Sequence, residues 1–341
     1  MTHAMRERRI LRGMNNRIVT GLLACSITLA GCVDGAADKK NAQPAPPRAT
    51  VTTPGTLQSA HEAYLDGDFL AVGERIRDVL LDTGSSDAVK QNAFELLDKA
   101  YEAQKGKMPS RFVLPTGFEG IKYSAVRGMS EQGPFFRISL YGHTRDSSHL
   151  KSVVVRRLPD ETVLDTTPGK GKDALKLKHD KEGYDTFIVE RVMQILPADG
   201  VLSVRFELDD GTVTEGFFIT RGLTPSTSPE IRTPLSSSTI SETHPIVSWV
   251  PFATPESAPY ESRTLSVYLS REGASGAAWD FWTQGYGDLA QVRVGDHPPA
   301  AKTSLLPGDY WLNVSCGEGR WFGPVGVFRG GSTISQFHVV P

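Results

Sequence analysis

The stretch VLSVRFELDDGTVTEGFFIT, residues 201–220, decides the fold class. Apolar side chains occupy every second position of its first half and alternate with Ser, Arg and Glu. This period of two places the apolar residues on one face of a β-strand. Asp209-Asp210-Gly211 supplies turn residues, and a second strand-like run follows over 213–220, so the stretch predicts a β-hairpin.

The same period extends on both sides of this hairpin, from about residue 110 to residue 223. Further strand-like runs lie at 122–126, 136–140, 152–156 and 187–193. No helical crossover separates these runs, and strands joined without crossovers pair in the antiparallel sense. We therefore expect residues 108–223 to form an antiparallel β-sandwich.

A second β unit is expected at 242–341, after a Ser-, Thr- and Pro-rich linker at 224–241. Trp249 lies in its first strand-like run, and the sequence Leu306-Pro307-Gly308-Asp309-Tyr310 precedes a late one. This pattern resembles fibronectin type III modules. The resemblance implies a β-sandwich with Trp249 in the core and a hydroxyl of Tyr310 that bonds back across a corner.

Residues 56–107 carry a helical period instead, with apolar residues three or four apart. The stretch AHEAYLDGDF, residues 60–69, resembles the turn between the helices of a tetratricopeptide repeat. The resemblance covers about one and a half repeats, whereas about three are needed for an independent fold, so this segment should pack on its neighbour. The whole pattern predicts a mostly β chain with an N-terminal α-helical segment, in which two antiparallel β-sandwich domains follow a helical hairpin.

The stretch LLDTGSSD, residues 80–87, resembles the catalytic motif of aspartic proteases at Asp82. Such a protease needs a second Asp on β structure that shares one proton with the first. No second Asp-Thr-Gly or Asp-Ser-Gly occurs in the sequence. The alternative, which we favour, is a turn between helices: Gly84 supplies a left-handed residue and Ser85 or Ser86 caps the next helix.

The first 31 residues are typical of a secretory signal. Five Arg residues precede Ile18, and the 14 residues from Ile18 to Gly31 are apolar or small, too few to span a bilayer. Translation from Met14 would give a more compact signal, and the sequence leaves Met1 and Met14 both open as the start.

Leu29-Ala30-Gly31-Cys32 resembles the lipobox of bacterial lipoproteins. The resemblance implies cleavage before Cys32 and a lipid anchor on its thiol, including palmitate-type acyl chains; an ordinary signal with an incidental Cys is the alternative. Val33 stands where an Asp would imply retention in the inner membrane, so the resemblance implies an outer-membrane lipoprotein of the cell envelope, facing the periplasm. Residues 32–55 are rich in Pro and are expected to form a lipidated tether.

Removal of the signal would change the charge and the cysteine content of the chain. It takes five Arg and one Glu from 37 basic and 39 acidic residues, which leaves 32 and 38 and a net charge of −6. This balance gives no indication of nucleic-acid binding. Of the three cysteines, Cys25 leaves with the signal and Cys32 carries lipid, so Cys316 has no partner for an internal disulfide.

Four of the five Trp residues fall between residues 279 and 321, and Tyr286 follows the first two of them. Two interpretations are open: these aromatic residues fill the core of the second unit, or they form a platform for sugar or peptide. In a strand, Trp279 and Trp282 would point to opposite faces, because their spacing is odd, whereas in a helical turn both would share a face. The candidate ligand-binding residues are Trp279, Trp282, Tyr286 and Trp321.

No catalytic or metal-binding motif stands out, and we expect no metal and no cofactor. The eight His residues are scattered, and the Lys residues at 170, 172, 176, 178 and 181 could meet anionic glycan or phospholipid, although a solvated loop is the simpler interpretation. The favoured function is a non-enzymatic, lipid-anchored binding or scaffold protein of the envelope with protein partners. The alternative is binding of cell wall or polysaccharide through the aromatic loop, and a third hypothesis is an enzyme with scattered catalytic residues.

Overall fold

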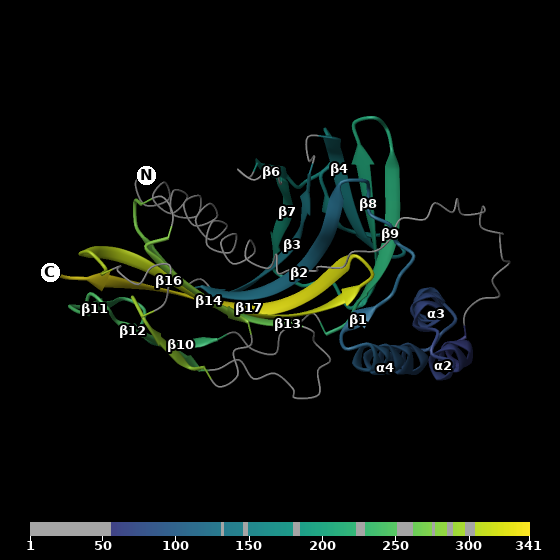
Figure 1. Cartoon of the computed structure of the whole chain (residues 1–341), viewed down its shortest axis with the longest axis horizontal. Helices are drawn as coiled ribbons and strands as arrows, with labels where there is room; N and C mark the ends of the chain where they lie inside the picture. The colour runs from purple at the N-terminus through teal and green to yellow at the C-terminus, as the bar shows by residue number, and fades with distance from the viewer. Residues whose placement is uncertain are drawn as a thin grey trace, which may run out of the picture.

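The computed structural model describes residues 56–130, 133–145, 149–179, 185–222, 229–250, 262–274, 277–284, 289–296 and 304–341 (Figure 1). In this part the chain is mostly β, with three helices at its N-terminal side, which confirms the predicted fold class. The signal, the tether with Cys32, and Tyr286 lie outside the described residues.

The predicted helical segment contains α2 (Leu57–Leu65), α3 (Phe69–Leu81) and α4 (Asp87–Ala103). Each helix begins after a residue whose side chain accepts a hydrogen bond from the backbone N–H three residues further on; these residues are Thr56, Asp68 and Ser86. The apolar faces of the helices join the same core as the first β unit, so the segment packs on its neighbour as expected.

The Asp-Thr-Gly stretch forms the turn between α3 and α4. The carboxylate of Asp82 accepts hydrogen bonds from the backbone N–H of Gly84 (3.0 Å) and the hydroxyl of Ser85 (2.8 Å), which hold its pKa below the usual value near 3.8. Ser86 caps α4. The expectation of a left-handed Gly84 is wrong, since Gly84 has no positive φ; the side chain of Asp82 closes the turn instead.

Sheet A has ten strands and runs through the whole β region. Eight follow one another in the order β14 (Trp279–Gln284), β13 (Ser262–Arg271), β16 (Gly308–Phe322), β17 (Val325–Val339), β2 (Phe118–Ser130), β3 (Gly133–Thr144), β7 (Asp185–Met193) and β6 (Leu175–His179). Two short strands pair in parallel with the long hairpin β16–β17: β1 (Lys107–Met108) with β16, and β11 (Ser238–Ile240) with β17.

Two smaller antiparallel sheets complete the β region. Sheet B consists of β5 (Glu161–Asp165), β4 (Leu150–Arg157), β8 (Gly200–Leu208) and β9 (Val213–Thr220), and sheet C of β10 (Glu230–Thr233), β12 (Ile246–Val250) and β15 (Gln291–Arg293). The predicted hairpin is β8–β9, with Gly211 at a positive φ of 85°. The stretch predicted as a linker contains β10 and β11.

A parallel pair of strands joins the two β units. β17 pairs with β2 from Val325 opposite Ile121 to Thr333 opposite Met129. The sequence did not predict this pairing, because the two segments lie about 200 residues apart and each has the alternation of an ordinary strand. As a result, the first and second units share one sheet.

Each smaller sheet encloses a core against sheet A. In the first unit Phe187 and Phe206 meet edge to face with ring centroids 5.9 Å apart. In the second, Trp249 is buried, and the hydroxyl of Tyr310 donates to the carbonyl of Leu306 (2.8 Å) and accepts from its N–H (3.0 Å). Both features implied by the fibronectin resemblance are therefore present.

Both cores lie on the same side of sheet A. On β16, Val314 points into the second core and Phe322 into the first, and on β17 Phe337 and Val325 do the same. Positions of equal parity share one face of a strand. Sheet C therefore lies below β16 and β17, and sheet B beside β2 and β3, on one face of sheet A (Figure 1). We call the other face, which runs across both units, the open face.

Candidate functional site: the open face of sheet A

The register of sheet A brings together four large side chains of the open face from four neighbouring strands. Trp321 of β16 lies opposite Gly326 of β17, Gly326 opposite Lys122 of β2, and Lys122 opposite Tyr141 of β3. Phe328 lies two positions further along β17, on the same face. We call Trp321, Phe328, Lys122 and Tyr141 the aromatic–lysine cluster.

Lys122 lies at the centre of this cluster. Its Nζ is 5.6 Å from the ring centroid of Tyr141 and 5.6 Å from that of Phe328, within the range of cation–π attraction. Burial lowers the pKa of Lys122, and no ion pair joins its ammonium to a carboxylate in the part of the chain that the structure describes. Trp321 meets Phe328 edge to face, with centroids 6.2 Å apart. All four side chains are partly exposed.

Glycines form the floor under the Phe328 ring. A Cβ added to Gly319 would lie 2.1 Å from a ring carbon of Phe328, and one added to Gly326 would lie 2.6 Å from another. Glycine inside a strand weakens the strand and often marks a close approach of another group. Here the group that approaches closely is the Phe328 ring, which packs against the backbone of β16 at Gly319 and of β17 at Gly326.

A polar row crosses the open face further along the same strands. The hydroxyls of Ser266 and Ser315 are 2.9 Å apart, and the hydroxyl of Ser332 donates to the side-chain oxygen of Asn313 (2.6 Å). Trp282 of β14 lies opposite Ser266 at the edge of this row. The four polar residues of this row are themselves buried, whereas Trp282 at its edge is partly exposed.

The structure separates the four aromatic residues that the sequence singled out. Trp279 is 1% exposed in the second core, whereas Trp282 is partly exposed on the open face, which confirms the strand alternation. Trp321 is on the open face too, but in another register row. Trp282 shares its row with Ser315 of β16, and Trp321 lies six residues further along β16, a distance of about 20 Å in a strand. Trp282 and Trp321 therefore belong to different parts of the face. Tyr286 lies outside the described residues.

The first unit's part of the open face is basic. Four register rows cross β2, β3, β7 and β6 between His143 and Arg137. Their described residues include four basic side chains and one carboxylate. The basic residues are Lys122, Arg137, Lys176 and Lys178, and the carboxylate is Glu190. Lys176 forms an ion pair with Glu190, and Arg137 is buried near it, with its pKa lowered by burial. Lys176 and Lys178 belong to the Lys-rich stretch noted in the sequence, so part of that stretch is strand β6.

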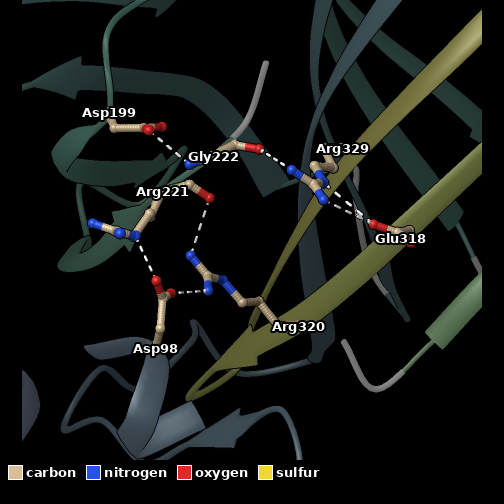
Figure 2. Close-up of polar contacts among 7 residues, drawn as sticks. All are labelled: Asp98, Asp199, Arg221, Gly222, Glu318, Arg320 and Arg329. Carbon is tan, nitrogen blue, oxygen red and sulfur yellow. Dashed lines mark hydrogen bonds and ion pairs between the residues drawn. The ribbon is translucent and has the colours of Figure 1, made fainter. Parts of the chain in front are cut away.

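A separate group of charges joins α4 to the β units (Figure 2). The carboxylate of Asp98 in α4 accepts from Arg320 of β16 (3.0 Å) and forms an ion pair with Arg221 (2.6 Å), which follows β9. Arg320 also donates to the carbonyl of Arg221 (3.1 Å), and its guanidinium lies 4.3 Å from the ring centroid of Tyr101. The Arg320 side chain is only 3% exposed, so its charge needs these partners.

A second set of charged residues lies beside the first set in Figure 2. We call the two sets together the polar junction. Arg329 of β17 donates to Glu318 of β16 (3.1 and 3.3 Å) and to the carbonyl of Gly222 (2.9 Å). The N–H of Gly222 donates to Asp199 (2.6 Å). Glu318 is fully buried. Because each of these charges is engaged by another part of the chain, the polar junction is suited to hold the helices and both units together.

The remaining chemistry of the described chain is limited. Within the described ranges no group of three or more His, Cys, Asp or Glu residues could hold a metal ion. The described helices include none that is long and apolar enough to cross a membrane. Burial raises the pKa of the Cys316 thiol, which points at the carbonyl of Gly331 (3.8 Å), and such a buried thiol is unreactive.

No protein-family model matches the chain, and no match is found among curated proteins. Among solved structures, the chicken CNTN1 FN1-FN3 domains match at 12% identity and a TM-score of 0.21, over 66% of this chain and 66% of that one, so this chain spans just under two thirds of it. The CbhA fibronectin(III)-like modules of Clostridium thermocellum match at 7% identity and a TM-score of 0.21, over 64% and 93%. The tandem Ig repeats of Dlar match at 13% identity and a TM-score of 0.29, over 66% and 99%.

Proposed function

We propose that this chain is a lipid-anchored protein of the cell envelope that binds a partner through the open face and catalyses no reaction. One observation carries the proposal: sheets B and C lie on the same side of sheet A. The other side of a ten-stranded sheet is thereby left for contacts outside the two sandwiches. Partly exposed aromatic side chains such as Trp282, Trp321 and Phe328 on this side are typical of binding surfaces.

The polar junction supports a scaffold role for the whole described region. It connects α4, the end of β9 and the long hairpin β16–β17 through ion pairs, in which Arg320 and Glu318 are buried and Asp98 is partly exposed. A partner bound on the open face would therefore meet one body rather than loosely linked domains.

Membrane attachment is the part of the proposal that depends on the lipobox. Cys32 would carry the lipid, and a random-coil tether of the length of residues 32–55 spans about 25 to 30 Å, so the folded part can stand off the membrane. Val33 supports the outer membrane as the site of anchoring. Cys32→Ser should release the protein from the membrane fraction. A variant that stayed in the pellet after a high-salt wash would contradict the anchor.

Site-specific photo-crosslinking in the native envelope tests the binding surface. A crosslinker in place of Ser139, on the open face, should give a defined adduct. The matched control replaces Thr162, an exposed residue of β5 in sheet B, and should give none. The same adducts from both positions, or none from Ser139, would show that the open face is not the binding surface.

Polysaccharide binding is the second candidate function, and Trp282 and Trp321 favour it because both are partly exposed on the open face. Flat aromatic faces stack on the apolar faces of sugar rings. Purified cell wall should retain the chain, and Trp282→Ala and Trp321→Ala should weaken retention separately, since the two residues lie in different parts of the face.

A further inference from the structure

We infer that the aromatic–lysine cluster binds a polysaccharide whose sugars carry carboxylates, with a carboxylate on Lys122 and neighbouring sugar rings against Phe328, Tyr141 and Trp321. This inference rests on the proposed function and names the ligand class for the open face. The site differs from the aromatic loop that the sequence suggested, because of its four residues only Trp321 came from the predicted set.

The ammonium of Lys122 is the first reason. An amine that is partly removed from water loses hydration, and burial accordingly lowers the pKa of this side chain. Cation–π attraction to the rings of Tyr141 and Phe328, each 5.6 Å away, replaces part of the lost hydration. In the described part of the chain no carboxylate pairs with Lys122, so an anionic group from a ligand would complete its contacts.

The arrangement of the rings is the second reason. Trp321, Phe328 and Tyr141 come from β16, β17 and β3, so the rings follow one another across the sheet, with Lys122 of β2 between Phe328 and Tyr141. Neighbouring strands lie about 4.8 Å apart, so Trp321 and Phe328 are one strand apart, and Phe328 and Tyr141 two strands, or about 10 Å, on the scale of one and two sugar units. Between them, Gly319 and Gly326 carry no side chain, which leaves the Phe328 ring as the surface that a ligand would touch.

The surrounding charge is the third reason. The chain without its signal has an expected net charge of −6, whereas the described rows around Lys122 carry four basic side chains and one carboxylate. A basic patch on an acidic protein attracts an acidic polymer over a distance of about 10 Å at moderate salt. A neutral polysaccharide would gain nothing from this patch.

Affinity electrophoresis of the full chain in non-ionic micelles tests the inference with polygalacturonate, dextran and poly-L-glutamate as probes. We expect polygalacturonate to retard the chain, added salt to weaken the effect, and dextran to have little effect. Lys122→Met, which keeps most of the unbranched apolar stem and removes the charge, should weaken binding about tenfold or more, as expected for the loss of a partly desolvated charge contact. Lys122→Arg should retain most of it.

Two controls separate binding from folding. Lys170→Met removes an equal charge from an exposed loop and should leave retardation unchanged. Far-UV circular dichroism and a thermal melt show whether Lys122→Met is folded; if it is not, Tyr141→Phe and Lys122→Arg, which conserve shape or charge, replace it, and both should still bind.

Three results would overturn the inference: unchanged binding by folded Lys122→Met, equal retardation by dextran, or equal retardation by poly-L-glutamate, since charge without a sugar ring would then suffice. If polygalacturonate failed while the Ser139 adduct persisted, the ligand class would be wrong and the proposed function would stand. If both failed, the open face would lose its proposed function as well.

Discussion

Trp279 and Trp282 lie three residues apart in β14 but serve opposite faces of sheet A. Trp279 is 1% exposed and stacks on Phe281 with a ring-centroid distance of 6.5 Å, whereas Trp282 is partly exposed. Trp279→Ala should therefore lower the free energy of unfolding by about 3 to 5 kcal/mol. Trp282→Ala should lower the free energy of unfolding much less, since the Trp282 side chain is partly exposed and is not part of the buried core. Denaturant unfolding of both variants measures the difference.

Trp279→Phe provides the control for this comparison. The indole nitrogen of Trp279 is buried and has no hydrogen-bond partner among the described residues, so phenylalanine removes this donor while it keeps most of the apolar contact. This variant should be clearly more stable than Trp279→Ala. Equal losses for Trp279→Ala and Trp282→Ala would mean that both rings stabilise the fold to the same extent.

Asp82 is a residue whose charge stabilises a turn, and its effect depends on pH. The hydrogen bonds from Gly84 and Ser85 lower its pKa in the folded state, while the unfolded chain keeps a value near 3.8. The stabilisation is therefore present above pH 3.8 and is lost as pH falls through the lower folded pKa. Asp82→Asn should melt slightly earlier than wild type at pH 7, and the difference should shrink in acid.

The control for this pH effect is Asp160→Asn, which removes one exposed carboxylate from another turn. It removes the same charge, so a difference between the two variants reports on the turn at Asp82 and not on the net charge. Proteolytic activity at acid pH that disappeared in Asp82→Asn would revive the protease interpretation, which the helical turn otherwise replaces.

At the scale of elements, the polar junction decides how α4, β9 and the hairpin β16–β17 stay together. Glu318 is fully buried, and its removal leaves the guanidinium of Arg329, 14% exposed, without its carboxylate. Glu318→Ala should cost about 3 to 5 kcal/mol in the free energy of unfolding, because removing one member of a buried ion pair is strongly destabilising. Urea denaturation measures this loss.

An exposed ion pair gives the matched control. Arg145 and Glu119 are 71% and 47% exposed with an N–O distance of 3.4 Å, so Glu119→Ala should cost about 1 kcal/mol or less. If Glu318→Ala were as mild as Glu119→Ala, the polar junction would not hold these elements together.

Elements with a local signal could be predicted from the sequence. The alternation and turn of residues 201–220 gave β8–β9, the helical period gave α2 to α4, and Tyr310 bonds back to Leu306 as the fibronectin resemblance implied. The pairing of β17 with β2 had no such signal, because it depends on residues far apart in the chain. The aromatic–lysine cluster was missed for the same reason, since its four residues come from four strands. The alternation of Gly with Trp and Phe in GEGRWFGPVGVFRGG, residues 317–331, was the one available sign of it.

At the scale of the whole molecule, the parallel pair β2–β17 makes the two units depend on each other. β2 lies between β3 and β17, so removal of the second unit would expose the backbone groups of a long strand. The same removal takes away Phe322, Val325 and Val327, which belong to the core of the first unit. The sequence predicted two separate sandwich domains, but because they share a sheet and core residues we expect them to unfold together.

A fragment of residues 56–241 tests this dependence. It keeps all the strands of sheet B and the helices but lacks β16 and β17, so we expect it to aggregate or to lack a cooperative melt, because an uncovered central strand invites pairing with other chains. Coexpression with residues 242–341 should restore a soluble complex in which β17 again covers β2. Calorimetry of the full chain should show a single melting transition for the two β units. A soluble 56–241 fragment with its own cooperative transition would show instead that the first unit folds alone and that the shared sheet forms only after folding.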